Sequence, residues 1–200
     1  MEDLAPPRNL SPRAKATRQK IYDAAIELIR AQGYDAVTMA DIASAAGVAR
    51  ASVFNHFPAK LAFLGEWFER FTREVLREAS QQTGNSARAR LECVFSAMGK
   101  GAHANKDIIV HVASLAMGHG PLAATEAELD DELQLYFLEI IRDGQASGEI
   151  KAELDPEFLA DMWVGLLTVT AHDWVNRGQA SNLSEDLTAR FKILFSGIEK

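Results

Sequence analysis

The chain has 200 residues, of which 48% are apolar, and a formal net charge of −7 at pH 7. This length can hold one large or two small domains around a substantial core. No window approaches the ~18 uninterrupted apolar residues of a membrane-spanning helix, so we expect no membrane partner. Cys93 is the single cysteine, which excludes an intrachain disulfide framework and a multi-cysteine zinc site. The start of the chain lacks a secretory pattern, and we expect residues 1–10 to be a flexible arm of a cytoplasmic protein.

The spacing of apolar residues predicts an all-α fold of about nine helices, without strands. Ser11 and Pro12 form a cap and a first-turn proline, and they predict a helix that Gly33 ends after about Gln32. Two short helices are expected within residues 38–57. Longer helices are expected at about 58–82, 88–102, 106–117, 122–146, 156–176 and 183–198.

The segment TMADIASAAGVARASVFNHF, residues 38–57, predicts a helix-turn-helix. Thr38 followed by Asp41 is typical of a capping box that begins the first short helix. Gly47 falls where the chain must turn sharply, because glycine enters the left-handed region without a Cβ penalty. Val48 and Val53 then fill the angle between the two helices, which is the layout that sends a second helix into the DNA major groove.

Short polar side chains remain on the outer face of the second helix, at Arg50, Ser52, Asn55 and His56. An alternative is a plain helical hairpin inside an all-helical core. These polar groups argue against it, because burying them unpaired would be unfavourable.

Charge is distributed unevenly along the chain. Residues 8–60 hold eight Lys and Arg against four Asp and Glu, whereas residues 61–200 hold 13 against 22. A basic N-terminal segment followed by an acidic remainder of the chain favours DNA as a partner. The basic segment would face the DNA and the acidic remainder would be repelled from it. Arg13, Lys15 and Arg18, near the start of the first helix, are suited to phosphate contact, although a solvated helix face would carry the same residues.

Residues from about Ala16 to Phe71 resemble the N-terminal domain of the TetR family of transcriptional regulators. The similarity lies in the segment AQGYDAVTM, in IASAAGVARASVFNHF, and in the run Pro58-Ala59-Lys60-Leu61 that follows. It covers a little over a quarter of the chain. The resemblance implies a three-helix DNA-binding domain at residues 11–60 and a helical ligand-sensing and dimerisation domain at residues 61–200.

The resemblance also implies which residues contact DNA. Thr38, His56 and Lys60 would meet phosphates, and the start of the second short helix would approach base edges, where Arg50 could bind guanine O6 and N7 together. Phe54 stands where the family usually has a tyrosine whose hydroxyl touches phosphate, so this contact is lost here. The implied DNA-binding residues are Thr38, Arg50, Ala51, Ser52, Asn55, His56 and Lys60.

The last two helices carry broad apolar stripes. Such stripes are usually intramolecular core. However, one short DNA-reading helix is too small to recognise a specific site by itself. A two-fold dimer would present two such helices to a palindromic operator. We therefore predict a homodimer through a four-helix bundle, as the resemblance also implies. The predicted interface residues are Phe158, Met162, Gly165, Val169, Leu187, Phe191, Leu194, Phe195 and Ile198.

The resemblance implies a small-molecule effector bound between helices of residues 80–180, although each candidate could equally be ordinary core. The candidates are Trp67, Phe71, Phe95, Met98, His111, Leu115, Met117 and Trp163. The eight-residue spacing of His103, His111 and His119 drifts round a helix and does not predict a metal site. No catalytic motif or cofactor signature is present.

The resulting hypothesis is a dimeric, ligand-responsive transcriptional repressor that binds a double-stranded DNA operator in a prokaryotic cytoplasm and is not an enzyme. The alternative is a helical small-molecule-binding protein whose DNA-binding part is inactive. The outer polar face of the second short helix argues against this alternative.

Overall fold

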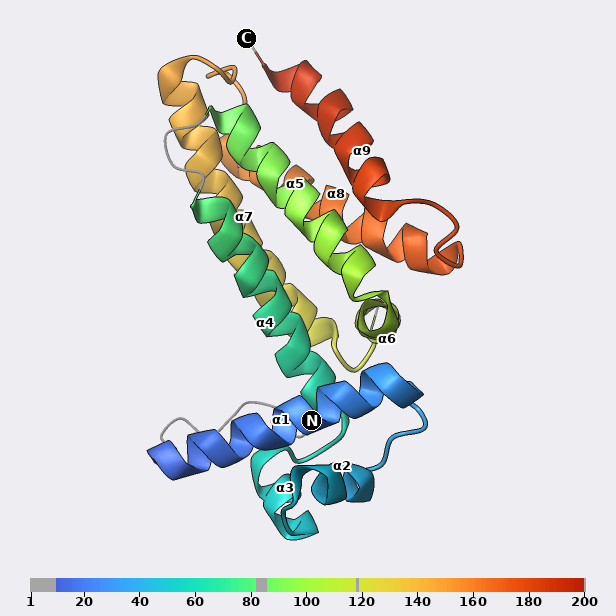
Figure 1. Cartoon of the computed structure of the whole chain (residues 1–200). Coiled ribbons are helices and arrows are strands. Elements are labelled where there is room, and N and C mark those ends of the chain that lie inside the picture. The colour runs from blue at the N-terminus through green and yellow to red at the C-terminus, as the bar shows by residue number, and fades with distance from the viewer. Residues whose placement is uncertain (1–9, 82–85, 118, 200) are drawn as a thin grey trace. The chain divides into compact units, whose positions relative to one another are not determined.

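The all-α prediction is confirmed by a computed structural model, which describes residues 10–81, 86–117 and 119–199 (Figure 1). In these residues the chain forms nine helices and no β-strand beyond an isolated bridge between Ile150 and Glu199. The helices are α1 (Pro12–Gln32), α2 (Met39–Ala46), α3 (Arg50–His56), α4 (Leu61–Ser80), α5 (Ala87–Ala104), α6 (Lys106–Ala116), α7 (Ala123–Ser147), α8 (Pro156–Asn176) and α9 (Leu183–Ile198). Apart from Leu10, the predicted arm lies outside the described residues.

Side-chain caps set where most of these helices begin. The Ser11 hydroxyl accepts the Ala14 N–H at 3.3 Å before α1, and the Asp155 carboxylate accepts the Phe158 N–H at 3.0 Å before α8. The expected start of α4 at Pro58 is wrong, since residues 58–60 form a turn and the helix begins at Leu61. The remaining helix boundaries agree with the sequence to within a few residues, and a side-chain cap marks the start of α1, α2, α5, α8 and α9.

The chain folds as two compact units. The N-terminal unit runs through Phe68 and also takes in Asp107–Val112, and the C-terminal unit comprises Glu69–Lys106 and Ala113–Lys200. Two helices, α4 and α6, therefore contribute residues to both units.

The N-terminal unit is built around α1, which packs across α2 and α3. Its core includes Ile21, Ile42 and Val53, all fully buried. The rings of Phe57 and Phe63 stack at 4.1 Å between centroids, and the Arg18 guanidinium lies 4.0 Å above the Phe57 ring. Arg18 also bonds to the His56 carbonyl and pairs with Glu66. It is therefore a structural residue, which corrects the suggestion that it meets phosphate.

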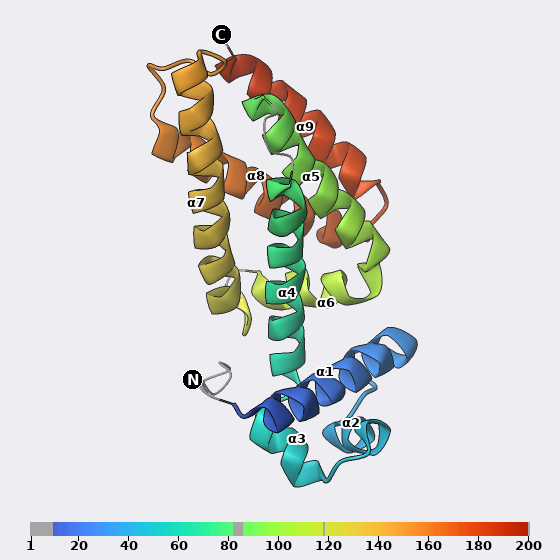
Figure 2. The same cartoon turned by 60° about the vertical axis from the view of Figure 1, so that its left-hand side comes forward.

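The C-terminal unit pairs α5 with α9 and α7 with α8, as both views show (Figures 1 and 2). Helices α5 and α9 approach so closely that a Cβ added at Gly99 would lie 2.5 Å from the Cα of Ser184. An aromatic cluster fills the interior. Its members are Phe95, Phe137, Trp163, Phe191 and Phe195, each at most 1% exposed.

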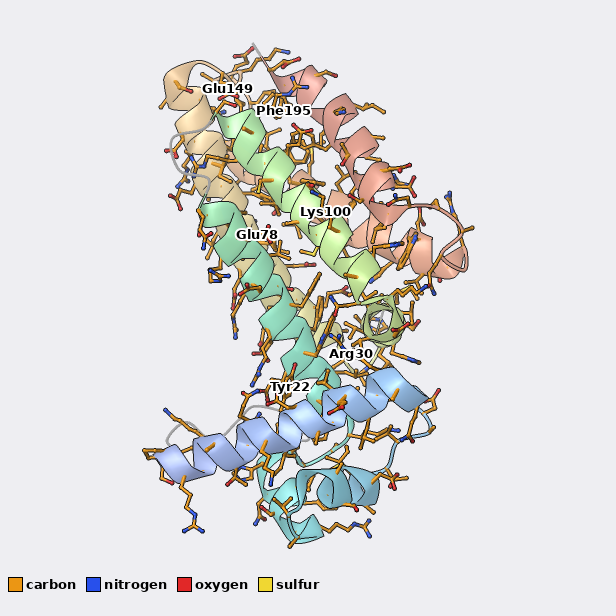
Figure 3. All side chains as sticks on the ribbon, in the orientation of Figure 1. Tyr22, Arg30, Glu78, Lys100, Glu149 and Phe195 are labelled. Carbon is orange, nitrogen blue, oxygen red and sulfur yellow. The ribbon has the colours of Figure 1, made fainter. Side chains whose placement is uncertain are left out.

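A carboxylate from the loop after α7 caps the start of α5. Glu149, labelled in Figure 3, accepts the backbone N–H groups of Ala87 at 2.6 Å and Arg88 at 2.9 Å. Arg88 in turn bonds to Glu199 at 2.8 Å, close to the end of α9. A negative group at a helix N-terminus is stabilising because it satisfies unpaired donors and opposes the helix dipole. Glu149 thus joins the loop after α7 to the start of α5, more than 60 positions earlier in the sequence.

One carboxylate makes the stability of the C-terminal unit depend on pH. Asp130 is half-buried, and burial, followed by the nearby Glu126 carboxylate, raises its pKa to about 6. Its Oδ1 atom lies 3.3 Å from the Thr168 hydroxyl, and Glu126 lies 3.0 Å from His172. Because the folded protein holds this proton more tightly than the unfolded chain does, the stabilisation is present at low pH and is lost as pH rises through 6.

We therefore expect Asp130→Asn to raise the free energy of unfolding at pH 7.5 by about 1 kcal/mol. The full pKa shift of Asp130 would correspond to ~3 kcal/mol of unfolding free energy. Solvent screening of this half-exposed carboxylate reduces the expected gain. The gain should shrink toward zero near pH 3, below the ordinary aspartate pKa of 3.8, where Asp130 is largely protonated in both states. Urea unfolding of both proteins at the two pH values measures this. A gain of equal size at both would mean that removal of the charge is not its cause.

Candidate nucleic-acid interface

The predicted capping box at the start of α2 is present. The Thr38 hydroxyl accepts the Asp41 N–H at 3.2 Å, and the Asp41 carboxylate accepts the Thr38 N–H at 2.9 Å and its hydroxyl at 2.6 Å. The hydrogen bonds from Thr38 lower the pKa of Asp41. Both donors that Thr38 was expected to offer to phosphate are engaged with this carboxylate. Thr38 caps α2 in the protein without DNA, and its phosphate contact stays a prediction.

A glycine turn sets the angle between α2 and α3. Gly47 has φ 60° and ψ 41°, the left-handed conformation, and the Val48 N–H returns to the Ala43 carbonyl at 3.0 Å. A side chain at Gly47 would be strained in this conformation. Val53 is fully buried and Val48 is half-buried, so the two valines fill the angle between the helices. The helix-turn-helix is thus built as its sequence predicts.

The outer face of α3 carries the residues expected to reach base edges. Arg50, Ala51 and Asn55 are exposed, and Ser52 is half-buried. Phe54 is also exposed, and the Arg50 guanidinium carbon lies 5.5 Å from the centroid of its ring. This pair is one helical turn apart, so the phenylalanine that replaces the usual tyrosine supports the arginine instead of touching phosphate itself.

His56 ends α3 in a half-buried position. Burial, and then the Arg18 guanidinium, lower the pKa of His56 below 6.5, which makes the ring neutral at pH 7. Its Nδ1 atom is buried without a hydrogen-bond partner. A neutral imidazole still has one N–H to give to a phosphate, so the predicted contact is compatible with this geometry but brings no positive charge.

Lys60 does not face outward as a phosphate ligand would. Its ammonium donates to the carbonyls of Tyr34 at 2.7 Å, Val37 at 3.0 Å and Asp35 at 3.4 Å, and it lies 4.2 Å from the centroid of the Tyr34 ring. Its three donors are used within the protein. These bonds are those of the protein without DNA, and the phosphate contact of Lys60 stays a prediction.

An exposed cation that sequence reasoning passed over lies beside the helix-turn-helix. A Cβ placed at Gly47 would be 3.6 Å from the Lys20 ammonium, so this α1 side chain reaches the turn between α2 and α3. Arg13 and Lys15 are also exposed on α1. The net charge of +4 in residues 8–60 was the available signal in the sequence. It could not single out Lys20, because the approach of this side chain to the Gly47 turn depends on how α1 crosses α2.

The predicted effector-binding residues fall in different surroundings. Trp67, Phe95 and Trp163 are buried in cores, and the others are half-buried: Phe71, Met98, His111, Leu115 and Met117. Trp67 and His111 belong to the N-terminal unit, and the other six belong to the C-terminal unit. The indole N–H of Trp163 is buried without a hydrogen-bond partner among the aromatic rings.

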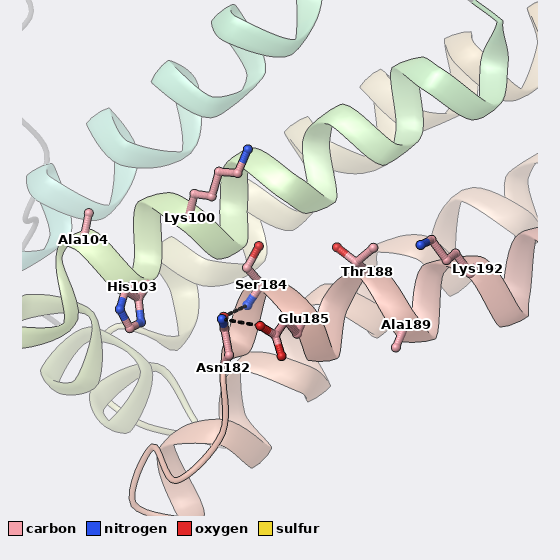
Figure 4. Close-up of a pocket in the computed structure, with 9 residues that line it drawn as sticks. All are labelled: Lys100, His103, Ala104, Asn182, Ser184, Glu185, Thr188, Ala189 and Lys192. Atoms are coloured by element: carbon pink, nitrogen blue, oxygen red, sulfur yellow. Dashed lines mark hydrogen bonds between the residues drawn. The ribbon is translucent and has the colours of Figure 1, made fainter.

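The C-terminal unit also has a surface groove that none of these residues line. It has a volume of about 650 Å³ and lies between α5 and α9 (Figure 4). Its lining is Lys100, His103, Ala104, Asn182, Ser184, Glu185, Thr188, Ala189 and Lys192. Asn182 caps α9 by accepting the Ser184 N–H at 3.1 Å, and its amide donates to the Glu185 carboxylate at 2.9 Å.

The predicted dimer interface divides into two sets. On α8, Phe158 and Val169 are 63% and 56% exposed, and Met162 and Gly165 are exposed between them. On α9, by contrast, the predicted residues turn inward: Leu187, Phe191, Phe195 and Ile198 are buried in their own unit and Leu194 is half-buried. The four buried residues are corrected as core. The exposed apolar side chain of α9 is Ile193, at 75%.

Within the described residues no cluster of three or more His, Cys, Asp or Glu side chains could hold a metal ion. In the same part of the chain, no helix is both long and apolar enough to span a bilayer. What the geometry does provide is a helix-turn-helix whose second helix exposes polar side chains, a class of fold that reads DNA from the major groove. The protein is a DNA-binding transcriptional regulator.

Comparison with known proteins points to one family. Residues 21–66 match the family model described as bacterial regulatory proteins, tetR family. Over 90% of this chain and 94% of the relative, the sequence is 27% identical to the fatty acid metabolism regulator protein of Bacillus subtilis. Together these matches support a transcriptional regulator of the TetR family.

Solved structures share the fold of nearly the whole chain. The transcriptional regulator FadR from Bacillus subtilis, in complex with stearoyl-CoA, superposes with a TM-score of 0.73 at 24% identity, over 90% of this chain and 98% of the other. FadR from Thermus thermophilus, a transcriptional repressor in complex with lauroyl-CoA, superposes with a TM-score of 0.69 at 25% identity, over 89% and 92% of the two chains. The all-α, two-part organisation of this chain is thus shared with ligand-bound regulators.

Proposed function

We propose that the chain is a homodimeric cytoplasmic repressor that occupies a palindromic operator and leaves it when a small-molecule effector binds. The observation that supports this best is the exposed polar face of α3. The helix has seven residues, so one copy reads few base pairs, and two copies related by a two-fold axis would read the two halves of a palindrome.

The exposed face of α8 is the proposed dimer interface. Phe158, Met162, Gly165 and Val169 recur at intervals of four, three and four residues, which places them on one side of the helix. A Cβ added at Gly165 would meet nothing within 4 Å, so space is open there for a partner. Ile193 on α9, a helix that packs against α8, is a further exposed apolar side chain. A contiguous exposed apolar surface of this kind is typical of a protein–protein contact.

The proposed effector is a fatty acyl-coenzyme A thioester. The support is the stearoyl-CoA and lauroyl-CoA held by the two FadR structures, whose fold this chain shares. Release of operator DNA by lauroyl-CoA or stearoyl-CoA, but not by free coenzyme A, tests this proposal. Release must be measured below the micelle-forming concentration of the thioester, so that detergent action is not mistaken for induction.

The Arg50 side chain is the proposed base reader. We expect Arg50→Ala to weaken operator binding by about 1–3 kcal/mol, or roughly 5- to 150-fold, and to relax the base preference at one position of each half-site. Fluorescence anisotropy with operator variants measures both effects. Glu27→Ala, a change of an exposed α1 residue away from α3, is the control. Unchanged affinity in Arg50→Ala would remove this residue from the readout.

The proposal as a whole is tested by selecting genomic DNA fragments on the purified protein and titrating the enriched pool at two salt concentrations. A palindromic motif with steep salt dependence is the expected result, because each phosphate contact adds about 0.9 to the slope of log affinity against log salt. Folded dimer that enriches no fragment, yet binds lauroyl-CoA, would favour the alternative of a small-molecule-binding protein with an inactive DNA-binding unit.

A further inference from the structure

The groove between α5 and α9 gathers positive charge on an acidic part of the chain. Residues 61–200 hold 13 Lys and Arg against 22 Asp and Glu, whereas the lining of the groove holds Lys100 and Lys192 against the single carboxylate of Glu185. Both lysines are exposed, and within the described residues neither makes a hydrogen bond or an ion pair. An anionic ligand would therefore meet two cations that no carboxylate of the protein pairs with.

Three polar side chains of α9 stand in one row along the groove. Ser184, Thr188 and Lys192 follow one another at intervals of four residues, which places them on the same side of the helix. Figure 4 shows the hydroxyls of Ser184 and Thr188 pointing to this side from successive turns. At a rise of 1.5 Å per residue the row is about 12 Å long. It thus offers two hydroxyl donors, followed by an ammonium.

The packing of α5 on α9 places the second ammonium at the opposite end of this row. A Cβ added at Gly99 would lie 2.5 Å from the Cα of Ser184, so the two backbones are close at this point. At the other end of α5, Arg88 bonds to Glu199 at 2.8 Å, which shows that the two helices run antiparallel. Lys100 follows Gly99 and therefore stands at the Ser184 end of the row. The groove has a cation at each end and hydroxyl groups between them.

Phosphate is the anion that this set of groups suits. A lysine ammonium binds phosphate as a point charge, and a hydroxyl group can donate to a phosphate oxygen. The groove has a volume of about 650 Å³, within the range of sites for small organic ligands, and Ala104 and Ala189 give it an apolar part. A row about 12 Å long exceeds a single phosphate ion and suits a diphosphate with an organic group attached.

We propose that the groove between α5 and α9 binds a small molecule of nucleotide size through its phosphate groups. Lys100, Lys192 and the hydroxyls of Ser184 and Thr188 hold the phosphates, and the organic part lies against the alanines. A free nucleotide and the nucleotide end of coenzyme A both have this chemistry. The site shares no residue with the predicted effector-binding set or with the exposed face of α8, so it does not depend on operator binding or on the dimer interface.

Titration calorimetry of the full chain with ADP and with adenosine, at low salt and without DNA, tests the site. ADP should bind and adenosine should not. The double variant Lys100→Ser/Lys192→Ser should weaken ADP binding at least about 10-fold, because it removes both cations of the groove. The control Lys15→Ser/Lys20→Ser removes two exposed lysines from the N-terminal unit and should leave ADP affinity unchanged. Loss of binding in the control alone would place ADP on the DNA-binding unit and overturn the proposal, as would equal binding of adenosine.

A second variant predicts a gain in affinity, which poor folding could not produce. Glu185→Gln removes the carboxylate of the groove and should strengthen ADP binding about 3-fold, because a like charge no longer opposes the phosphates. Glu153→Gln, which changes an exposed carboxylate outside the lining, should have no effect. An equal gain in both variants would show a general effect of net charge and would contradict a site at the groove.

Free coenzyme A distinguishes the two sources of the phosphate groups. Binding at least about 10-fold tighter than that of ADP, and lost in Lys100→Ser/Lys192→Ser, would assign the groove to the nucleotide end of coenzyme A. Binding no tighter than that of ADP, with the same dependence on the two lysines, would assign it to a free nucleotide. If neither ADP nor coenzyme A binds, the proposal fails, and the proposed operator binding is untouched by that result.

Discussion

Replacing Phe191 with alanine is expected to lower the free energy of unfolding by about 3–5 kcal/mol, the range for removing a large aromatic side chain from a packed core. Phe191 is fully buried, and its ring lies 5.4 Å from that of Phe95, 5.3 Å from that of Trp163 and 5.6 Å from that of Phe195. The surrounding rings are rigid and collapse poorly onto a cavity, which favours the upper part of the range. Denaturant unfolding followed by far-UV circular dichroism measures the change.

The matched control is Leu135→Ala, which truncates a side chain that is 66% exposed on α7. It should change the free energy of unfolding by less than about 0.5 kcal/mol. If Phe191→Ala left stability almost unaltered but separated the subunits, the residue would belong to a dimer interface, as its sequence pattern indicated, and the structural assignment to the core would be wrong.

Gly165→Arg is expected to leave each subunit folded but monomeric, and to weaken operator binding at least about 100-fold. Its own chain can accept the side chain, since nothing lies within 4 Å of the new Cβ, and arginine is a better helix former than glycine. In the proposed dimer the same side chain would place a bulky charge at the centre of the α8 surface. A monomer also loses the gain in affinity that comes from presenting two reading helices together.

Sedimentation velocity at micromolar concentration and anisotropy with operator DNA measure the two effects. Leu135→Arg places the same charge on an exposed apolar position of another helix and should leave both the dimer and operator binding intact. A dimeric Gly165→Arg protein with full operator affinity would move the interface away from α8.

Much of the fold could be predicted because the signals are local. Thr38 with Asp41 begins α2, Gly47 ends it, and Asp155 with Pro156 begins α8; each acts within one turn of chain. The helix-turn-helix followed for the same reason. Such features depend on backbone conformation and neighbouring hydrogen bonds, which the sequence specifies directly.

The side of a helix that faces the core was harder to predict. On α9, apolar residues occupy more than one face, so Phe191 and Ile193 look alike in the sequence although one is fully buried and the other is largely exposed. Only the close approach of α5 at Gly99 and Ser184 decides which face turns inward. On α8 the apolar residues extend round the helix, and the inner face is taken by Leu159, Trp163 and Leu167.

The role of cationic side chains was the least predictable feature. Arg18, Lys20 and Lys60 are all basic residues of the N-terminal unit, yet two of them bond to backbone carbonyls and one remains exposed at the turn. Those carbonyls lie 23 or more positions away in the chain. Every residue type has a backbone carbonyl, so the sequence does not indicate which carbonyl accepts the bond. A pattern of charges can therefore indicate that a unit binds DNA without indicating which charges do so.

Helix α6 contributes residues to both units. It is a single helix of 11 residues, about 16 Å long, whose residues Asp107–Val112 belong to the N-terminal unit and whose residues from Ala113 onward belong to the C-terminal unit. The ring of His111 packs on that of Tyr34, two residues before the first α6 residue of the C-terminal unit. A substitution at His111 is therefore expected to disturb the α1–α2 loop of the N-terminal unit without altering the exposed face of α3.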